Sequence, residues 1–127
     1  MIEVNKPQIL IVEDAVEVVE ILRIAFRKTN LELHHCPSGP EALNYLDTHT
    51  PDLIILDIAL PGMSGWDLLD IIREEGGMHD TPVVVLTSYT DSANRKTGRL
   101  RNVFAYFSKP INLDELRAAI NSALHLN

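Results

Sequence analysis

Short apolar runs alternate along the chain with stretches in which apolar residues recur every three or four positions. The runs predict strands, because they are short and rich in β-branched residues, and the spacing of the other stretches predicts amphipathic helices. Near-continuous apolar strands separated by helices are typical of a parallel sheet covered on both faces. We therefore expect an α/β fold, a five-stranded parallel sheet built from five βα units. The expected strands are Gln8–Val12, Leu31–Cys36, Asp52–Leu60, Thr81–Thr87 and Phe104–Ser108.

One of the expected helices has an unusual pattern. The segment Asp91–Asn102 contains two apolar residues, Ala93 and Leu100, and a glycine near its end. Because a short helix gains most of its stability from packing an apolar face, we expect this segment to be short, mobile or irregular. The other helices are expected from Asp14 to Phe26, after the turn Pro37–Pro40, over Trp66–Glu75 and over Asn112–Leu126.

The length and composition are those of one globular domain. We expect a single domain over residues 1–127, with its core at about 8–126, and a cytoplasmic location. Apolar residues make up 46% and charged residues 23%, which excludes a disordered or fibrous chain. No apolar run approaches the roughly 20 residues of a membrane helix, and the start of the chain is too polar for a secretory leader. Cys36 is the only cysteine, so an internal disulfide is excluded.

The formal net charge is −7, and basic side chains are concentrated in residues 93–127. An acidic chain binds nucleic acid and anionic membranes poorly, so we expect no direct nucleic-acid binding and no membrane contact. The basic residues of the segment 91–102 have no aromatic residues between them, which favours a solvated face or a contact with a protein partner.

Polar residues follow the predicted strands at the edge where ligands bind in open α/β sheets. Glu13 and Asp14 follow the first strand, Thr87 ends the fourth, and Lys109 follows the fifth. Asp57 interrupts the apolar run 53–60, where an ionised carboxylate without partners would cost several kcal/mol or become neutral. We interpret Asp57 as a carboxylate held by a cation and available as a nucleophile.

Each of these residues also has a simpler interpretation. Asp57 would bond to backbone amides, Asp14 would cap the first helix, Lys109 would be solvated and Thr87 would be an ordinary strand residue. Capping does not explain two adjacent acids directly after a buried strand. Because nearby carboxylates repel one another unless a cation joins them, and because oxygen ligands suit Mg²⁺, we expect a magnesium site.

Five motifs stand in order along the chain: Ile9-Leu-Ile-Val-Glu-Asp14, Leu53-Ile-Ile-Leu-Asp57, Leu60-Pro-Gly-Met-Ser-Gly65, Val83-Val-Val-Leu-Thr87 and Lys109-Pro110. Together they resemble the receiver domain of two-component response regulators, in particular the chemotaxis type. The resemblance covers nearly the whole chain. It implies a flavodoxin-like, doubly wound (βα)5 fold, and a phosphorylation-regulated signalling domain that catalyses only its own phosphorylation and slow dephosphorylation.

The resemblance also implies a role for each residue. Asp57 would accept a phosphoryl group from a sensor histidine kinase or a phosphotransfer protein. Thr87 and Lys109 would contact the phosphoryl oxygens, Tyr106 would be the switch aromatic that moves inward with Thr87, and the Lys109–Pro110 bond would be cis. Mg²⁺ would be held by Glu13, Asp14, Asp57 and the backbone carbonyl of Ala59.

The implied output is a changed surface around Tyr106 that signals to a downstream protein or to an attached output domain, from a monomer or a phosphorylation-dependent dimer. The polar fourth helix departs from the family pattern, which leaves the mode of signalling open. Tyr89, two residues after Thr87, occupies a variable family position that affects phosphoryl lifetime.

Other functions fit the residues less well. A phosphohydrolase of the haloacid dehalogenase type also uses an aspartyl nucleophile, but it needs a second acid where this chain has Ala59. A partner-binding domain that is never phosphorylated would not need the full set of polar residues. No glycine-rich fingerprint of a dinucleotide-binding domain follows the first strand. Adjacent His34 and His35 point to opposite faces of a strand, which disfavours a metal site there, and Trp66 is interpreted as a packing residue.

Overall fold

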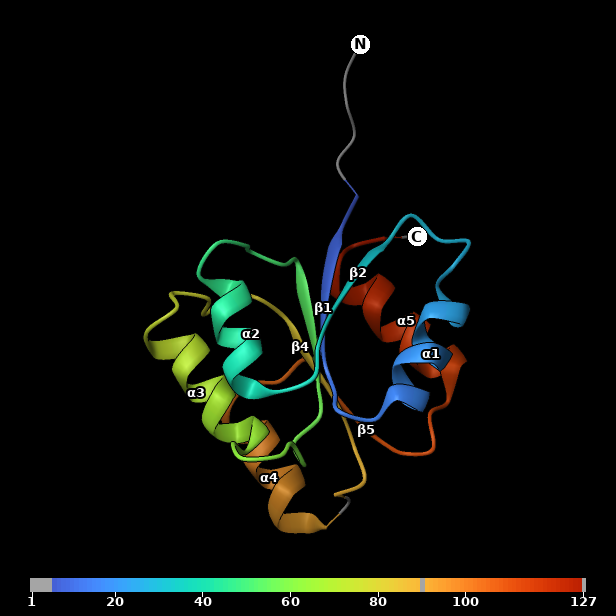
Figure 1. Ribbon diagram of the computed structural model, residues 1–127. Coiled ribbons are helices and arrows are strands. Elements are labelled where there is room, and N and C mark those ends of the chain that lie inside the picture. The colour runs from blue at the N-terminus through green and yellow to red at the C-terminus, as the bar shows by residue number, and fades with distance from the viewer. Residues whose placement is uncertain (1–5, 90, 127) are drawn as a thin grey trace.

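The computed structural model describes residues 6–89 and 91–126, so the parts of the predicted domain at 1–5, 90 and 127 lie outside the described residues. Five parallel strands form one sheet in the order β2-β1-β3-β4-β5. The predicted five-stranded parallel sheet is confirmed (Figure 1). The strands are β1 (Gln8–Val12), β2 (Glu32–Cys36), β3 (Leu53–Leu56), β4 (Val83–Thr87) and β5 (Ala105–Ser108).

Helices cover both faces of this sheet. In Figure 1, α2, α3 and α4 lie on one side of the strands and α1 and α5 lie on the other, as expected for a doubly wound fold. None of the helices within the described ranges is long and apolar enough to cross a membrane. The helices are α1 (Val16–Ala25), α2 (Gly39–Leu46), α3 (Gly65–Glu74), α4 (Ser92–Leu100) and α5 (Leu113–Ala123).

The core is divided in two by the sheet, because successive side chains of a strand point to opposite faces. Leu10, Ile54 and Val83 belong to the cluster that packs against α2 and α3. Ile9 and Ile55 belong to the other cluster, which includes the buried faces of α1 and α5. This two-sided burial explains why the central strands are apolar without interruption, and it holds their carboxyl ends rigidly at one edge.

Two predicted boundaries were wrong near that edge. The third strand ends at Leu56 instead of Leu60, and the chain turns so that the Ala59 N–H donates to Asp57 Oδ1 at 3.1 Å. The first helix begins at Val16 after the N-cap residue Ala15, and no side chain caps it, so Asp14 is not the cap. The Asp14 side chain therefore does not cap α1.

A close approach of backbone brings the start of α3 against the end of β3. A Cβ atom at Gly65 would lie 2.5 Å from the Asp57 carbonyl oxygen and 2.7 Å from the Ile58 Cα. The Gly65 N–H donates to the Ile58 carbonyl at 3.0 Å. Only glycine allows this approach, which fixes the loop that follows Asp57.

Of the alternatives expected for 91–102 (short, mobile or irregular), the structure shows the first. The segment Ser92–Leu100 forms a regular α-helix of 9 residues, short as expected, in which only Gly98 is buried. Asp91 caps it by accepting a hydrogen bond from the Asn94 N–H at 3.1 Å. At the other end Arg101 donates two hydrogen bonds to Asp70 on α3, at 2.9 and 3.0 Å. Polar contacts thus replace the missing apolar stripe.

Candidate functional site

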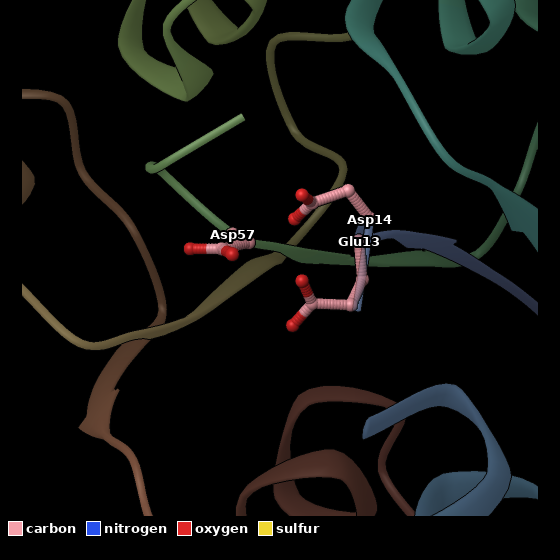
Figure 2. Close-up of side chains that lie close together, drawn as sticks. All are labelled: Glu13, Asp14 and Asp57. Atoms are coloured by element: carbon pink, nitrogen blue, oxygen red, sulfur yellow. The ribbon is translucent and has the colours of Figure 1, made fainter. Parts of the chain in front are cut away.

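The carboxyl ends of three strands bring the predicted polar residues together. Figure 2 shows the side chains of Glu13 and Asp14, after β1, close to that of Asp57, after β3. Lys109, after β5, reaches across from the edge of the sheet and lies within 4.0 Å of two of these carboxylates. The convergence expected from the parallel topology is therefore present in the structure.

Asp57 is almost fully buried, with an exposed fraction of 4%. Its Oδ2 lies 3.2 Å from the Lys109 Nζ, and its Oδ1 accepts the Ala59 N–H at 3.1 Å. Burial alone would raise its pKa, but hydrogen bonds from Glu13, Ala59 and Thr87 and the charge of Lys109 outweigh burial and lower it. Asp57 is therefore ionised at neutral pH, and it is not simply a carboxylate bonded to backbone amides.

Glu13 is buried beside it, with an exposed fraction of 2%. Its Oε1 lies 2.6 Å from the Lys109 Nζ, and its Oε2 accepts the Ala15 N–H at 3.2 Å. Burial, together with the neighbouring Asp57, raises the pKa of Glu13 to about 7, although Lys109 acts in the opposite direction. The site thus gathers three carboxyl groups around one lysine, and Glu13 is partly protonated at neutral pH.

Lys109 is the cation of the cluster, and its pKa is raised. Burial acts to lower that pKa, but the hydrogen bond to Glu13 and the charges of Asp57 and Glu13 more than compensate. The predicted cis bond between Lys109 and Pro110 is present. Lys109 is not a solvated surface side chain. Its exposed fraction is 19% and its ammonium faces the carboxylates.

Three carboxylates at this edge have the chemistry of a hard-cation site. Glu13, Asp14 and Asp57 each offer one oxygen atom, and these atoms lie within 4.8 Å of one another. Asp14 is exposed while the other two are buried, so the cluster opens toward solvent on one side. Carboxylate oxygens with room for water suit Mg²⁺, and the residues present therefore fit the expected ion.

Thr87 and Tyr106 lie beside this cluster and are linked through Tyr89. Thr87 is fully buried at the end of β4, and its Oγ1 accepts the Tyr89 N–H at 3.2 Å. The Tyr106 hydroxyl donates to the Tyr89 carbonyl oxygen. Sequence reasoning treated Tyr89 only as a neighbour of the site, since no local pattern shows that its backbone joins Thr87 to Tyr106.

Two histidines and an open cavity lie near the acidic cluster. The ring nitrogens of His34 and His35 contact Gln8 Oε1 and the Glu13 carbonyl oxygen, at 2.8 and 2.7 Å. The two ring nitrogens thus contact different groups, one on Gln8 and one on the backbone of Glu13. An open cavity of about 600 Å³ lies next to the acidic cluster, bounded by Asp14, the loop after β3, and Tyr89.

Comparison with known proteins identifies the family. A family model described as the response regulator receiver domain matches residues 9–121. The fold is similar to a Francisella response regulator receiver domain, with a TM-score of 0.85 and 26% identity over 94% of this chain and 97% of that one. It is also similar to the signal receiver domain of a histidine kinase from Syntrophus aciditrophicus, with a TM-score of 0.84 and 28% identity, over 94% and 90% of the two chains.

Curated relatives correct the expectation about partners. The chain is 32% identical to the DNA-binding response regulator MtrA of Mycolicibacterium paratuberculosis, over 96% of this chain and 53% of that protein. It is also 32% identical to the transcriptional regulatory protein KdpE of Mycobacterium tuberculosis, over 94% and 51%. The prediction of no direct nucleic-acid binding is contradicted by these relatives, which are named as DNA-binding and transcriptional regulators. The chain spans about half the length of the curated relatives it matches.

The family model, the relatives and the solved structures agree over most of the chain. The order of the five motifs along the sequence and their meeting at one sheet edge are explained by the same assignment. The chain belongs to the receiver domains of response regulators, the signalling domains of two-component systems.

Proposed function

We propose that this receiver domain accepts a phosphoryl group on Asp57 from a phosphohistidine of a sensor histidine kinase. One observation carries the proposal: Asp57 is a buried carboxylate with a lowered pKa, 3.2 Å from an ammonium group and within the cluster it forms with Glu13 and Asp14. An ionised carboxylate is a nucleophile, and the exposed Asp14 marks the side of the cluster that faces solvent.

The transfer breaks one bond and forms one. An Asp57 carboxylate oxygen attacks the phosphorus atom, an oxygen–phosphorus bond forms, and the phosphorus–nitrogen bond of the donor breaks. The electron pair of that bond stays on the imidazole nitrogen, which takes up a proton. Positioning and charge compensation are the main needs of such a transfer, because its transition state is loose.

Lys109 and Thr87 are the residues that meet the incoming charge. A phosphoryl group brings about −1.5 to −2 charge into a pocket that already contains carboxylates. The Lys109 ammonium contacts Asp57 directly, and the Thr87 hydroxyl is among the groups that lower the pKa of Asp57. Both can therefore contact phosphoryl oxygens on Asp57 without a large movement.

We propose that Glu13, Asp14 and Asp57, with the backbone carbonyl of Ala59, hold Mg²⁺. The ion would supply positive charge beside the phosphoryl oxygens at the moment of transfer. The three carboxyl groups around one lysine and the raised pKa of Glu13 support this, since both indicate a site that gains from a further cation.

The output proposed for this domain is a shift between two arrangements of the surface around Tyr106. The Tyr106 hydroxyl is bonded to the Tyr89 carbonyl, and the Tyr89 N–H is bonded to Thr87. A Thr87 hydroxyl drawn toward a phosphoryl group therefore disturbs the backbone that holds Tyr106. The names of the relatives support a transcriptional effect of the whole protein.

Intact-mass spectrometry after incubation with acetyl phosphate and Mg²⁺ tests this function. The proposal expects one added phosphoryl group, which is lost in Asp57→Asn and with a chelator. Asp67→Asn is the matched control, because Asp67 is an exposed acid in the first turn of α3. The control protein should be phosphorylated as well as the wild type. An adduct that persists in Asp57→Asn, or an adduct independent of Mg²⁺, overturns the proposal.

A further inference from the structure

A hydrogen bond between two helices involves the only tryptophan of the chain. Trp66 lies in the first turn of α3 and is buried, with an exposed fraction of 9%. Its indole N–H donates to Asn94 Oδ1 on α4 at 2.8 Å. Packing alone, which is the interpretation from sequence, does not account for this directional contact.

The partner of Trp66 is itself held in one orientation. Asn94 donates through its side-chain nitrogen to Asp91 Oδ1 at 2.8 Å and through its backbone N–H to Asp91 Oδ2 at 3.1 Å. Asp91 is the N-cap of α4. A chain of hydrogen bonds therefore runs from the indole through Asn94 to the cap, and it ties the start of α4 to α3.

The helix that this chain holds depends on few other contacts. Only Gly98 of α4 is buried, so little apolar packing fixes the position of the helix. The Arg101–Asp70 pair holds the C-terminal end to α3. Loss of the Trp66 bond would thus remove the hydrogen bond that joins the N-terminal end of α4 to α3.

The Tyr106 ring packs against the same helix. A Cβ atom at Gly98 would lie 3.1 Å from Tyr106 Cδ2 and 3.4 Å from Trp66 Cη2, so both aromatic rings meet at this glycine. The Trp66 and Tyr106 ring centroids are 6.4 Å apart, and the Arg95 guanidinium lies 5.2 Å from the centre of the Tyr106 ring. The position of α4 therefore decides where the Tyr106 ring packs.

We infer that Trp66 is a positioning residue for the movement of Tyr106. Through its hydrogen bond to Asn94, Trp66 holds α4 in the position in which the helix packs against the Tyr106 ring. The hydrogen bond stabilises the arrangement described here, in which Tyr106 lies against α4 and bonds to the Tyr89 carbonyl. A ligand at Asp57 that draws Tyr106 away from α4 therefore has to overcome the arrangement that the Trp66–Asn94 hydrogen bond stabilises. The inference rests on the proposed function, because that function makes the movement of Tyr106 the response.

A titration with beryllium fluoride in the presence of Mg²⁺ tests the inference, since this complex imitates a phosphoryl group on a carboxylate. The chain has one tryptophan, so its indole N–H gives one NMR signal. We expect that signal to move saturably in the wild-type protein. In Asn94→Ala the half-saturation concentration should fall about fivefold, the change expected when one hydrogen bond of the competing arrangement is lost.

Two further variants separate positioning from general destabilisation. Trp66→Phe keeps an aromatic ring and removes the hydrogen-bond donor. Because this variant has no indole signal, its beryllium fluoride titration is measured by the rise in Tm. The half-saturation concentration should fall about as much as in Asn94→Ala. Asn44→Ala, at an exposed position on α2, is the matched control and should resemble the wild type.

The outcomes distinguish this inference from the proposed function. A wild-type indole signal that stays in place while beryllium fluoride raises the Tm overturns the inference and leaves the function of Asp57 intact. An unchanged or higher half-saturation concentration of beryllium fluoride in Asn94→Ala would likewise overturn the inference and leave the function of Asp57 intact. No rise in Tm and no phosphoryl adduct would overturn both.

Discussion

The ammonium of Lys109 lies 2.6 Å from a carboxylate oxygen of Glu13, and the two residues come from opposite parts of the chain. Glu13 follows β1 and Lys109 follows β5, so the contact exists only because the sheet brings these strand ends to one edge. It makes Lys109 a structural cation in addition to the role proposed for it as a contact of a phosphoryl oxygen.

Removal of this ammonium should destabilise the protein in the absence of Mg²⁺. Lys109→Met leaves the Glu13 and Asp57 carboxylates facing one another without a cation, which should cost about 2 kcal/mol in the free energy of unfolding. Urea denaturation measures this cost, and added Mg²⁺ should reduce it. Lys96→Met, at an exposed position on α4, is the control. Equal stability of the two variants would contradict the account.

Mg²⁺ should raise the Tm of the wild-type protein, because a ligand that binds only the folded state stabilises it. Asp14→Asn removes one carboxylate charge from the exposed side of the cluster without leaving a buried charge unpaired. We expect the Mg²⁺ concentration needed for a given rise in Tm to increase at least about tenfold. Asp47→Asn, at the exposed end of α2, should behave as the wild type. A normal Mg²⁺ response in Asp14→Asn would rule out its role as a ligand.

The close approach at the start of α3 predicts a strong effect from a single methyl group. Gly65→Ala places a Cβ atom 2.5 Å from the Asp57 carbonyl oxygen, so the backbone after the acceptor must shift. We expect a loss of about 1–3 kcal/mol in the free energy of unfolding and slower phosphorylation by acetyl phosphate. Chemical denaturation and intact mass measure the two effects. Wild-type values for both would show that the loop after β3 adapts freely.

The cap of α4 predicts a pH dependence. Hydrogen bonds from Asn94 to the Asp91 side chain lower the pKa of Asp91 from its ordinary value of 3.8. Its contribution to stability is therefore present above that ordinary value and is lost as the pH falls through the lowered pKa.

Comparison with Asp91→Asn isolates this contribution, since asparagine also caps helices but does not titrate. As the pH falls from neutral into the acid range, the unfolding free energy of the wild type should decrease relative to that of Asp91→Asn. A difference that is constant with pH would contradict the assignment of Asp91 as a charged cap.

The parts of the fold that sequence could predict are those fixed by local patterns. Uninterrupted apolar runs identified the strands, and parallel topology then placed Glu13, Asp57 and Lys109 at one edge without knowledge of the strand order. The predicted contacts follow because only one edge of such a sheet collects the residues after each strand.

Local patterns could not predict the structure where contacts between elements decide it. The helix α4 is regular because Asp91, Asn94 and Arg101 form polar contacts, and three of these contacts reach Trp66 and Asp70 on α3. No periodicity within 91–102 could reveal them. The simpler interpretation of Asp14 as a cap also does not hold, because the chain enters α1 one residue later than the capping pattern indicates.

The central claim is that Asp57 carries the phosphoryl group. Its most direct test is reduction of the acetyl-phosphate-treated protein with borohydride, followed by peptide mass spectrometry, because an acyl phosphate is reduced to an alcohol at the residue that carried it. The account predicts homoserine at position 57 in the Mg²⁺-treated protein, and none in the chelator control. A reduced residue at another carboxylate, with Asp57 intact, would contradict it.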